Sequence, residues 1–368
     1  MIIERLSVLN FKNIEETELN FSPKMNCLFG DNGMGKTNLL DALYYLSFTK
    51  NYTNLHDSML IFHNREFAVL QGVYLSEQGK QEIYCAIRQG KKKILKCNKK
   101  EYERLSEHIG LIPLVMISPA DSELIRGGSD ERRKFIDMLI CQYDREYMHA
   151  LMQYNKALLQ RNALLKTEGA DEIFDLWEER MDQMARVIYV KRKALIDTFL
   201  PVFQTYYHEI ANESEQVALK YESQLHNNAS LLTMLTARRE RDKILGYTSA
   251  GIHKDDFAFL LDDYLIRKIG SQGQNKTYLI ALKLAQFRLL TQKNTSTPLL
   301  LLDDLFDKLD AIRVERIVRL VTQDEFGQIF ITDTNRQYLD AILAKMQSDY
   351  RLFQVENGQI WNANTSNP

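Results

Sequence analysis

The chain has 368 residues, of which 45% are apolar and 26% charged, and its formal net charge at pH 7 is −2. The composition is typical of a globular protein, and the length suits one large or two ordinary domains. The slightly negative net charge argues against a surface that binds nucleic acid over most of its area. No apolar run reaches the roughly 18 residues of a membrane span, and residues 1–5 do not resemble a signal peptide, so we expect a cytoplasmic protein with no membrane partner. The cysteines lack zinc-site spacing, and we expect reduced thiols at Cys27, Cys85, Cys97 and Cys141.

A phosphate-binding loop is predicted at residues 30–37, which fit the pattern Gly-x-x-x-x-Gly-Lys-[Ser/Thr]. Residues 25–29 before it are mostly apolar, as in a buried strand, and residues 38–46 after it carry apolar side chains at helical spacing. Such a unit points backbone N–H groups and a helix dipole at one anion. We expect ATP here, with Lys36 on its β- and γ-phosphates and the Thr37 hydroxyl on Mg²⁺. The predicted contacts are Gly30, Asp31, Asn32, Gly33, Met34, Gly35, Lys36, Thr37 and Asn38.

Short strand-like runs dominate from about residue 60 to residue 115, for example at 67–75 and 82–87. They predict an antiparallel lobe that caps the nucleotide-binding sheet. Residues 88–104 within it are strongly basic, and two interpretations stay open, a DNA-phosphate patch or a solvated hairpin. The cations are Arg88, Lys91, Lys92, Lys93, Lys96, Lys99, Lys100 and Arg104.

The pattern turns helical from about residue 121 to residue 245. Apolar residues at 4-3 spacing in 147–165, interrupted by Arg161, and again in 173–195 predict two antiparallel helices in a short arm, not a long coiled coil. We expect Pro201 to open a further helix, at a position that proline tolerates.

The remaining basic groups have local acids nearby. Arg132, Arg133 and Lys134 face a nucleotide, DNA or only neighbouring carboxylates. Two further groups are interpreted as the solvated faces of helices: Arg186, Lys191, Arg192 and Lys193, and then Arg238, Arg239, Arg241 and Lys243. No base-reading motif occurs, so any DNA binding should be directed at shape and backbone.

A small-residue turn at 270–276 precedes an apolar helix at 278–285. It resembles the signature loop of ABC-type ATPases, which offers a serine hydroxyl, glycine amides and a helix dipole to a phosphate. In those ATPases the phosphate belongs to the other subunit's nucleotide, so the resemblance implies an ATP-dependent head-to-tail homodimer. The predicted contacts are Ser271, Gln272, Gly273 and Gln274.

Residues 298–304 are an apolar strand ending in two carboxylates, as in a Walker B segment. The carboxyl ends of parallel strands are where open α/β sheets bind ligands. We predict that Asp303 binds Mg²⁺, directly or through water, and that Asp304 orients the attacking water or takes its proton. The predicted catalytic residues are Lys36, Asp303 and Asp304, and the predicted metal ligands are Thr37 and Asp303.

Two segments follow the Walker B strand. Residues 305–310 look like a D-loop, and residues 328–334 look like the next core strand. Transporter-type ATPases end that strand in a histidine that senses the γ-phosphate, whereas Asp333 stands here. Thr332 or Thr334 is a candidate to supply a hydroxyl instead.

Five stretches of the chain are typical of one family, at residues 9–14, 117–121, 127–137, 154–162 and 251–256. Through them nearly the whole chain resembles the RecF family of bacterial ATPases, which are related to SMC heads. It departs from the family at Ala120, where Glu is commoner, and at Lys12 and Lys254, where Arg is commoner. The resemblance implies Lys12 as a further nucleotide contact.

Motifs and resemblance together predict an α/β fold, an ABC/SMC-like P-loop ATPase head with an antiparallel β capping lobe and an inserted helical arm domain. Residues 1–120 and 246–368 form the two parts of the head, and residues 121–245 form the arm. The family resemblance implies ATP and Mg²⁺ as cofactors and an ATP-driven dimer on double-stranded or gapped DNA. It also implies slow hydrolysis for release and work with RecR and RecO to load RecA.

Two other functions share part of the pattern. A transporter nucleotide-binding subunit would more typically carry a Q-loop glutamine, a glutamate after the Walker B aspartate and a switch histidine; residues 118–121, Asp304 and Asp333 argue against it. A small-molecule P-loop kinase would need no signature loop. A scaffold with a relic site is least favoured, because every motif is chemically intact.

Overall fold

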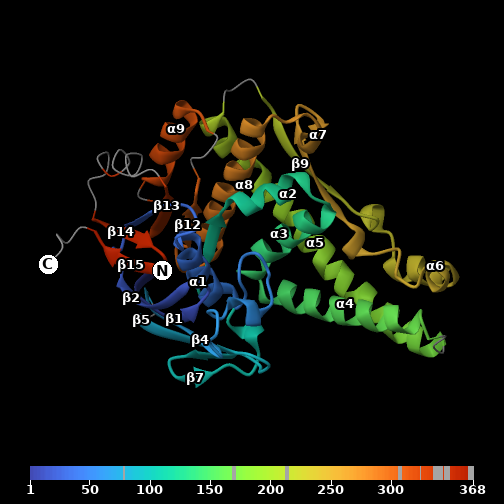
Figure 1. The fold of residues 1–368 in the computed structure, drawn as a ribbon. Helices are drawn as coiled ribbons and strands as arrows, with labels where there is room; N and C mark the ends of the chain where they lie inside the picture. The colour runs from blue at the N-terminus through green and yellow to red at the C-terminus, as the bar shows by residue number, and fades with distance from the viewer. Residues whose placement is uncertain are drawn as a thin grey trace. The chain divides into compact units, whose positions relative to one another are not determined.

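The computed structural model describes residues 1–77, 79–167, 171–211, 215–305, 309–323, 325–334, 343 and 349–363 (Figure 1). The chain forms two compact units, one of residues 1–121 with 286–368 and one of residues 122–285. Residues 246–285, which the sequence analysis assigned to the C-terminal part of the head, thus group with the helical residues before them.

The first unit contains a mainly parallel sheet with the strand order β15-β14-β3-β13-β12-β8. Its strands are β3 (Met25–Phe29), β8 (Leu114–Ile117), β12 (Leu299–Asp303), β13 (Ile329–Asp333), β14 (Tyr350–Glu356) and the antiparallel edge strand β15 (Gln359–Asn362). Strands β8, β12 and β13 are buried along their whole length, which explains their continuous apolar sequence. Parallel pairing places the carboxyl ends of β3, β13, β12 and β8 at one edge.

An antiparallel sheet of order β2-β1-β4-β5-β6-β7 forms the rest of the β-structure in this unit. Its strands are β1 (Ile2–Phe11), β2 (Ile14–Asn20), β4 (Phe67–Ser76), β5 (Gly79–Arg88), β6 (Ile94–Cys97) and β7 (Lys100–Glu101). The predicted strands at 67–75 and 82–87 are confirmed as β4 and β5.

Among the described residues, the helices that belong wholly to the first unit are α1 (Lys36–Phe48) and α9 (Ala311–Val321). Helix α1 starts directly after Gly35, as the P-loop pattern predicts, and is buried along most of its length. Short 3-10 turns lie elsewhere in the chain at Asp57–Leu60, Leu105–Glu107, Pro119–Asp121, His226–Asn228 and Ile252–Lys254.

The second unit is mainly helical. Its helices are α2 (Ser122–Arg126), α3 (Ser129–Cys141), α4 (Arg145–Leu164), α5 (Asp171–Ile210), α6 (Leu231–Leu245), α7 (Ile266–Ile269) and the first part of α8 (Gln272–Lys293). Helices α4 and α5 lie side by side, as the arm prediction expects (Figure 1). A small antiparallel sheet of order β11-β10-β9 completes the unit: β9 (Val217–Glu222), β10 (Asp256–Leu261) and β11 (Tyr264–Leu265).

Two expectations about the secondary structure of this unit are wrong. Pro201 does not open a helix but lies inside the 40-residue helix α5. Phe199 and Phe203 on either side of it are fully buried, so packing holds the chain helical despite the lost backbone hydrogen bond. Strand β9 lies in the region predicted to be helical, where its alternating burial and its pairing with β10 select the extended form.

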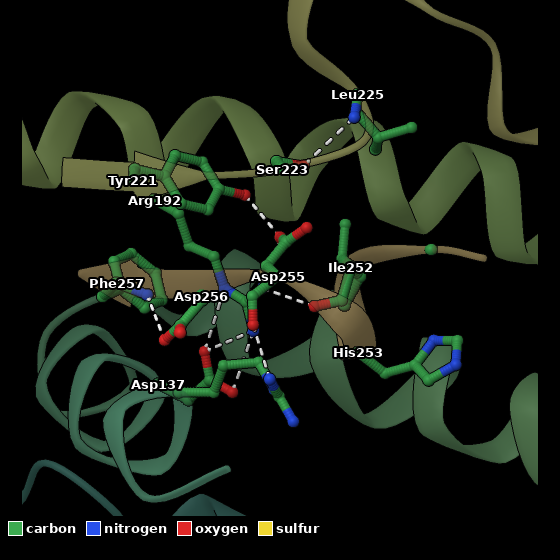
Figure 2. A network of polar contacts seen from close by, with 12 residues as sticks. Asp137, Arg192, Tyr221, Ser223, Leu225, Ile252, His253, Asp255, Asp256 and Phe257 are labelled. Carbon is green, nitrogen blue, oxygen red and sulfur yellow. Dashed lines mark hydrogen bonds and ion pairs between the residues drawn. The ribbon is translucent and has the colours of Figure 1, made fainter. Parts of the chain in front are cut away.

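Arg161 and Arg192 of the arm are fully buried, and the prediction of a solvated face is therefore wrong for Arg192. Arg192 is 1% exposed and donates to both carboxylate oxygens of Asp137, at 2.9 and 3.1 Å, and to Asp255 at 2.9 Å (Figure 2). Arg161, which interrupts the apolar pattern, donates to Glu178 at 2.9 Å and Asp242 at 2.8 Å, and all three side chains are fully buried. A guanidinium can be buried in this way because each one is matched by two carboxylates.

The basic run at 132–134 is also paired with acids. Arg132 holds Asp256 through two hydrogen bonds of 2.8 and 2.9 Å, Arg133 pairs with Asp130, and Lys134 pairs with Glu131. Of the three predicted partners of these cations, a nucleotide, DNA or neighbouring carboxylates, the structure shows the carboxylates.

Among the described residues, no helix combines the length and the apolar character that crossing a membrane requires.

Candidate nucleotide-binding site

The loop between β3 and α1 has a backbone that glycine alone adopts easily. Gly30, Gly33 and Gly35 have φ angles of 152°, 82° and 119°. A Cβ on Gly30 would lie 2.2 Å from the carbonyl oxygen of Val355, and one on Gly35 would lie 2.8 Å from Asn13 Oδ1. Two of the three glycines are therefore required by close packing as well as by conformation.

Two turns from distant parts of the chain hold this loop through one carbonyl group. The Met34 carbonyl accepts from Asn13 Nδ2 at 3.2 Å and from the Gly358 N–H at 2.8 Å. Asn357 and Gly358 join β14 to β15 with φ angles of 47° and 80°, as in a type I′ turn. Neither support was predicted from the sequence, although the Asn-Gly dipeptide between two strand-like runs was a usable signal.

Gly358→Ala should lower the free energy of unfolding by about 2 kcal/mol or more, because a left-handed alanine is strained and its Cβ would lie 2.0 Å from the Asn13 carbonyl oxygen. Gly90→Ala is the matched control, since Gly90 has a φ of 70° but nothing within 4 Å of its Cβ position. That variant should lose only about 1 kcal/mol, the strain alone. Urea unfolding of both variants measures the difference, and equal losses would contradict the role of the contact.

Lys36, the first residue of α1, is nearly buried, with 6% of its surface exposed. Its ammonium donates to the carbonyl oxygens of Gly30 at 2.6 Å and Asp31 at 2.9 Å. Burial lowers the pKa of Lys36, and the nearby carboxylates of Asp304, Asp303, Asp333 and Asp31 oppose that shift. A phosphate would offer this ammonium an anionic acceptor, which makes stronger hydrogen bonds than neutral carbonyls do.

Asp303 ends β12 and is surrounded by three hydroxyl groups. Its carboxylate accepts from Thr37 at 2.9 and 3.1 Å, from Thr332 at 2.8 Å and from Ser118 at 3.3 Å. Burial raises the pKa of Asp303, and the hydrogen bonds from Thr332, Thr37 and Ser118 oppose that shift. Thr37, on the first turn of α1, thereby meets a strand about 260 residues away, as the predicted site requires.

Thr332, one of the two candidates to replace a switch histidine, forms hydrogen bonds with both Walker B residues, Asp303 and Asp304. Its hydroxyl donates to Asp303 and accepts from the Asp304 N–H at 3.1 Å. Asp304 has a φ of 49° and is half-buried, and Asp333 is buried at the end of β13. Thr332 therefore orients the Asp303–Asp304 pair.

The donor set fits Mg²⁺ bound together with a nucleotide. Thr37 Oγ1 and the Asp303 carboxylate supply hard oxygen atoms at one point. Within the described ranges, no group of three or more His, Cys, Asp or Glu side chains could hold a metal ion. Nucleotide-bound Mg²⁺ needs only one or two protein ligands, because phosphates and water supply the rest.

Lys12 lies in the turn between β1 and β2, with a φ of 54°. Its ammonium pairs at 2.6 Å with the buried carboxylate of Asp41, one helical turn after Thr37 on α1. Asn38, on the same helix, donates to Asn13 Oδ1 at 2.7 Å. Both predicted contacts thus support the P-loop and its helix through hydrogen bonds and ion pairs.

The signature segment belongs to the second unit and starts α8 with a capping box. Ser271 Oγ accepts from the Gln274 N–H at 3.2 Å, and Gln274 Oε1 accepts from the Ser271 N–H at 2.8 Å. Gln274 also donates to Glu215 at 2.7 Å, whereas Ser271 and Gln272 are exposed. With Gly273 in the same first turn, these residues present a helix N-terminus that can bind a phosphate.

The predicted D-loop lies partly outside the described residues, which omit residues 306–308. Asp310, its last residue, caps α9 by accepting from the Arg313 N–H at 2.9 Å.

A parallel sheet with a glycine-rich loop after β3 and a carboxylate at the end of β12 defines a P-loop nucleotide-binding fold. The family described as RecF/RecN/SMC N terminal domain matches residues 2–360 of this chain. A RecF protein is 62% identical to this chain over 98% of its length. The chain therefore belongs to the RecF family within that group.

The DNA replication and repair protein RecF of Azobacteroides pseudotrichonymphae genomovar. CFP2 is 62% identical over 363 residues, 98% of this chain and 99% of the relative. The protein of the same description from Bacteroides fragilis (strain YCH46) is 60% identical, covering 98% of each chain. A solved recombination mediator protein RecF-ATP in the RecFOR pathway superposes with a TM-score of 0.89 at 27% identity, covering 98% and 97% of the two chains.

An Smc head domain derived from Pyrococcus furiosus shares the fold alone, with a TM-score of 0.60 at 17% identity over 98% of this chain and 96% of that chain. The predicted fold is thereby confirmed as a mixed α/β SMC/RecF-like ATPase head with an antiparallel sheet and a helical insertion.

Proposed function

We propose that this chain is an ATP-binding recombination mediator that acts in DNA replication and repair in the RecFOR pathway. The observation that carries the proposal is the meeting of Lys36, Thr37 and Asp303 at the carboxyl edge of the parallel sheet. The solved RecF-ATP protein and the RecF relatives support the nucleotide and the pathway.

In this proposal the loop N–H groups and Lys36 bind the phosphates, and Thr37 and Asp303 hold Mg²⁺, which neutralises phosphate charge when bound. Asp304 orients the attacking water or accepts its proton, in a slow hydrolysis reaction. Thr332 keeps the two carboxylates in place through the hydrogen bonds described above.

ATP acts as a switch between monomer and dimer. Ser271 of one copy contacts the nucleotide held by Lys36 of another, with Gln272, Gly273 and Gln274 completing the contact. A ligand that bridges two copies shifts the equilibrium by its higher affinity for the dimer. The dimer binds double-stranded or gapped DNA, works with RecR and RecO in loading RecA, and releases DNA on hydrolysis.

The basic segment at 88–104 is the proposed phosphate contact on DNA, without Lys93 and the half-buried Lys96. Lys93 Nζ is turned inward, donating to the Tyr45 hydroxyl at 2.9 Å and pairing with Asp57 at 2.8 Å. Exposed cations bind DNA phosphates without reading sequence. They are Arg88, Lys91, Lys92, Lys99, Lys100 and Arg104.

Ser271→Arg should abolish the ATP-dependent part of DNA binding, lowering affinity by about 10-fold or more, because a long cation replaces the hydroxyl that meets the partner's nucleotide. Fluorescence anisotropy of labelled duplex and gapped DNA, with ATP, with ADP and without nucleotide, measures it. Ser230→Arg is the matched control, since Ser230 caps α6 in the same unit through the Thr233 N–H.

Wild-type affinity that is equal with ATP, with ADP and without nucleotide would contradict the switch and leave DNA contacts that are independent of ATP. No binding to either DNA would refute the repair function and restore the transporter and kinase alternatives. Loss in Ser230→Arg as well as Ser271→Arg would assign the effect to folding of the second unit.

A further inference from the structure

A closed ring of polar contacts links helix α1 to the Walker B carboxylate by a route outside the P-loop. It starts at Asp41 on α1, passes through Tyr52 and Asp121 to Ser118, and reaches Asp303, which returns to α1 through Thr37. All of these residues lie in the first unit. Tyr52 and Asp121 have no part in the site as described so far.

The two ends of Tyr52 hold different parts of this ring. Its backbone N–H donates to Asp41 Oδ1 at 2.7 Å, beside the Lys12 ion pair on the other oxygen. Its hydroxyl donates to Asp121 Oδ1. Tyr52 therefore joins the helix that carries Thr37 to the segment that follows β8.

Asp121 in turn fixes the position of Ser118. Its second oxygen accepts from the Ser118 N–H at 2.8 Å, and its own N–H donates to the Ser118 carbonyl oxygen at 3.0 Å. The buried Ser118 hydroxyl then donates to Asp303 Oδ2 at 3.3 Å. The last contact is long, so small movements of the Asp121 turn decide whether Ser118 still orients Asp303.

The chemistry of the ring gives each group a defined role. Burial, aided by the Asp121 carboxylate, raises the pKa of Tyr52 well above its usual value, so the hydroxyl keeps its proton and remains a donor. The Tyr52 ring is held edge-on against Tyr44, with ring centres 4.8 Å apart, which restricts its motion. Removing this one hydroxyl therefore changes the Asp121 turn more than the packing around it.

We propose that Tyr52 and Asp121 are positioning residues that hold Ser118 against Asp303 and so set the affinity of the nucleotide site for Mg²⁺. The inference rests on the proposed ATP site. Groups behind metal ligands commonly change metal affinity by about 10- to 100-fold when they are removed.

The test is a Mg²⁺ titration of the full chain with an N-methylanthraniloyl-labelled ATP analogue, followed by fluorescence. Tyr52→Phe and Asp121→Asn should each raise the Mg²⁺ concentration at half-saturation by about 10-fold. Affinity for the analogue in EDTA should stay within about twofold, because neither group is placed to touch phosphate. The double variant Tyr52→Phe with Ser118→Ala should have the same Mg²⁺ concentration at half-saturation as Ser118→Ala alone, because Tyr52 acts through Ser118.

Tyr45→Phe is the matched control. Tyr45 also donates to a carboxylate, Asp57 at 2.8 Å, and it lies on α1, but that contact does not lead to Asp303. It should lower thermal stability and leave the Mg²⁺ midpoint unchanged. A Tyr52→Phe shift no larger than that of Tyr45→Phe would overturn the positioning role, and Ser118→Ala tests the same link if Tyr52→Phe folds poorly. A wild-type chain that fails to bind the analogue would instead refute the ATP site, and the positioning role with it.

Discussion

Lys36→Met is expected to weaken ATP binding by at least about 100-fold, because the variant loses charged hydrogen bonds to phosphate worth about 3 kcal/mol. Isothermal titration of ATP into the purified chain measures the loss. Methionine retains most of the volume of the lysine stem, so the P-loop and α1 keep their packing.

The same substitution should not lower the melting temperature. Burial lowers the pKa of Lys36, so the folded chain binds this proton less tightly than the unfolded chain does. Below the unfolded pKa, which includes neutral pH, the charged lysine therefore opposes folding, and this opposition disappears as pH rises past that pKa. Replacing the ammonium relieves it at pH 7.

Lys93→Met is the control, because it also removes a half-buried ammonium group from the first unit but lies outside the proposed ATP site. Because Lys93 pairs with Asp57 and bonds to Tyr45, that variant should lose stability and keep its ATP affinity. An ATP affinity within about threefold of wild type in Lys36→Met would contradict the proposed site, since charged hydrogen bonds to phosphate exceed that effect.

Arg192→Met should destabilise the second unit by about 3–5 kcal/mol at pH 7, because it leaves Asp137 and the fully buried Asp255 without their shared cation. The guanidinium also donates to the Ile252 carbonyl at 2.9 Å, which becomes unpaired as well (Figure 2). Urea unfolding followed by circular dichroism measures the loss. The matched control is Arg186→Met on the same helix, where a 70% exposed side chain pairs with Asp182. It should change stability by less than about 1 kcal/mol.

The deficit of Arg192→Met should shrink as pH falls. Burial already raises the pKa of Asp255, and Arg192 is the main group that opposes the shift. Without Arg192 the folded chain takes up a proton at Asp255 more readily than the unfolded chain does, so the variant gains stability at lower pH. Unfolding at pH 7 and pH 5.5 tests this, and a deficit that grows on acidification would contradict the assignment.

Much of the candidate site could be predicted because its parts are contiguous in the chain. The strand, glycine turn and helix around Lys36 form one segment, and Asp303 follows directly on an apolar strand. The Ser-x-x-Gln start of α8 is likewise local. In each case short-range geometry limits which residues can stand there.

Contacts between distant segments could not be predicted in this way. Met34 is held by Gly358, more than 300 residues away, and Asp303 is held by Thr332 on β13 and by Ser118, which directly follows β8. Strand order determines these neighbours, and hydrophobic periodicity contains no information about it.

Local pattern and spacing were enough to predict the phosphate loop, the Walker B strand, the antiparallel lobe and the helical arm. Contacts between distant segments account for the burial of Arg161 and Arg192, for the position of Pro201 within a helix, and for the link from Tyr52 to Asp303 through Asp121 and Ser118. Periodicity indicates which side of a helix faces the core. It does not indicate that Asp137 and Asp255, 55 and 63 residues from Arg192, pack against that arginine and neutralise its charge.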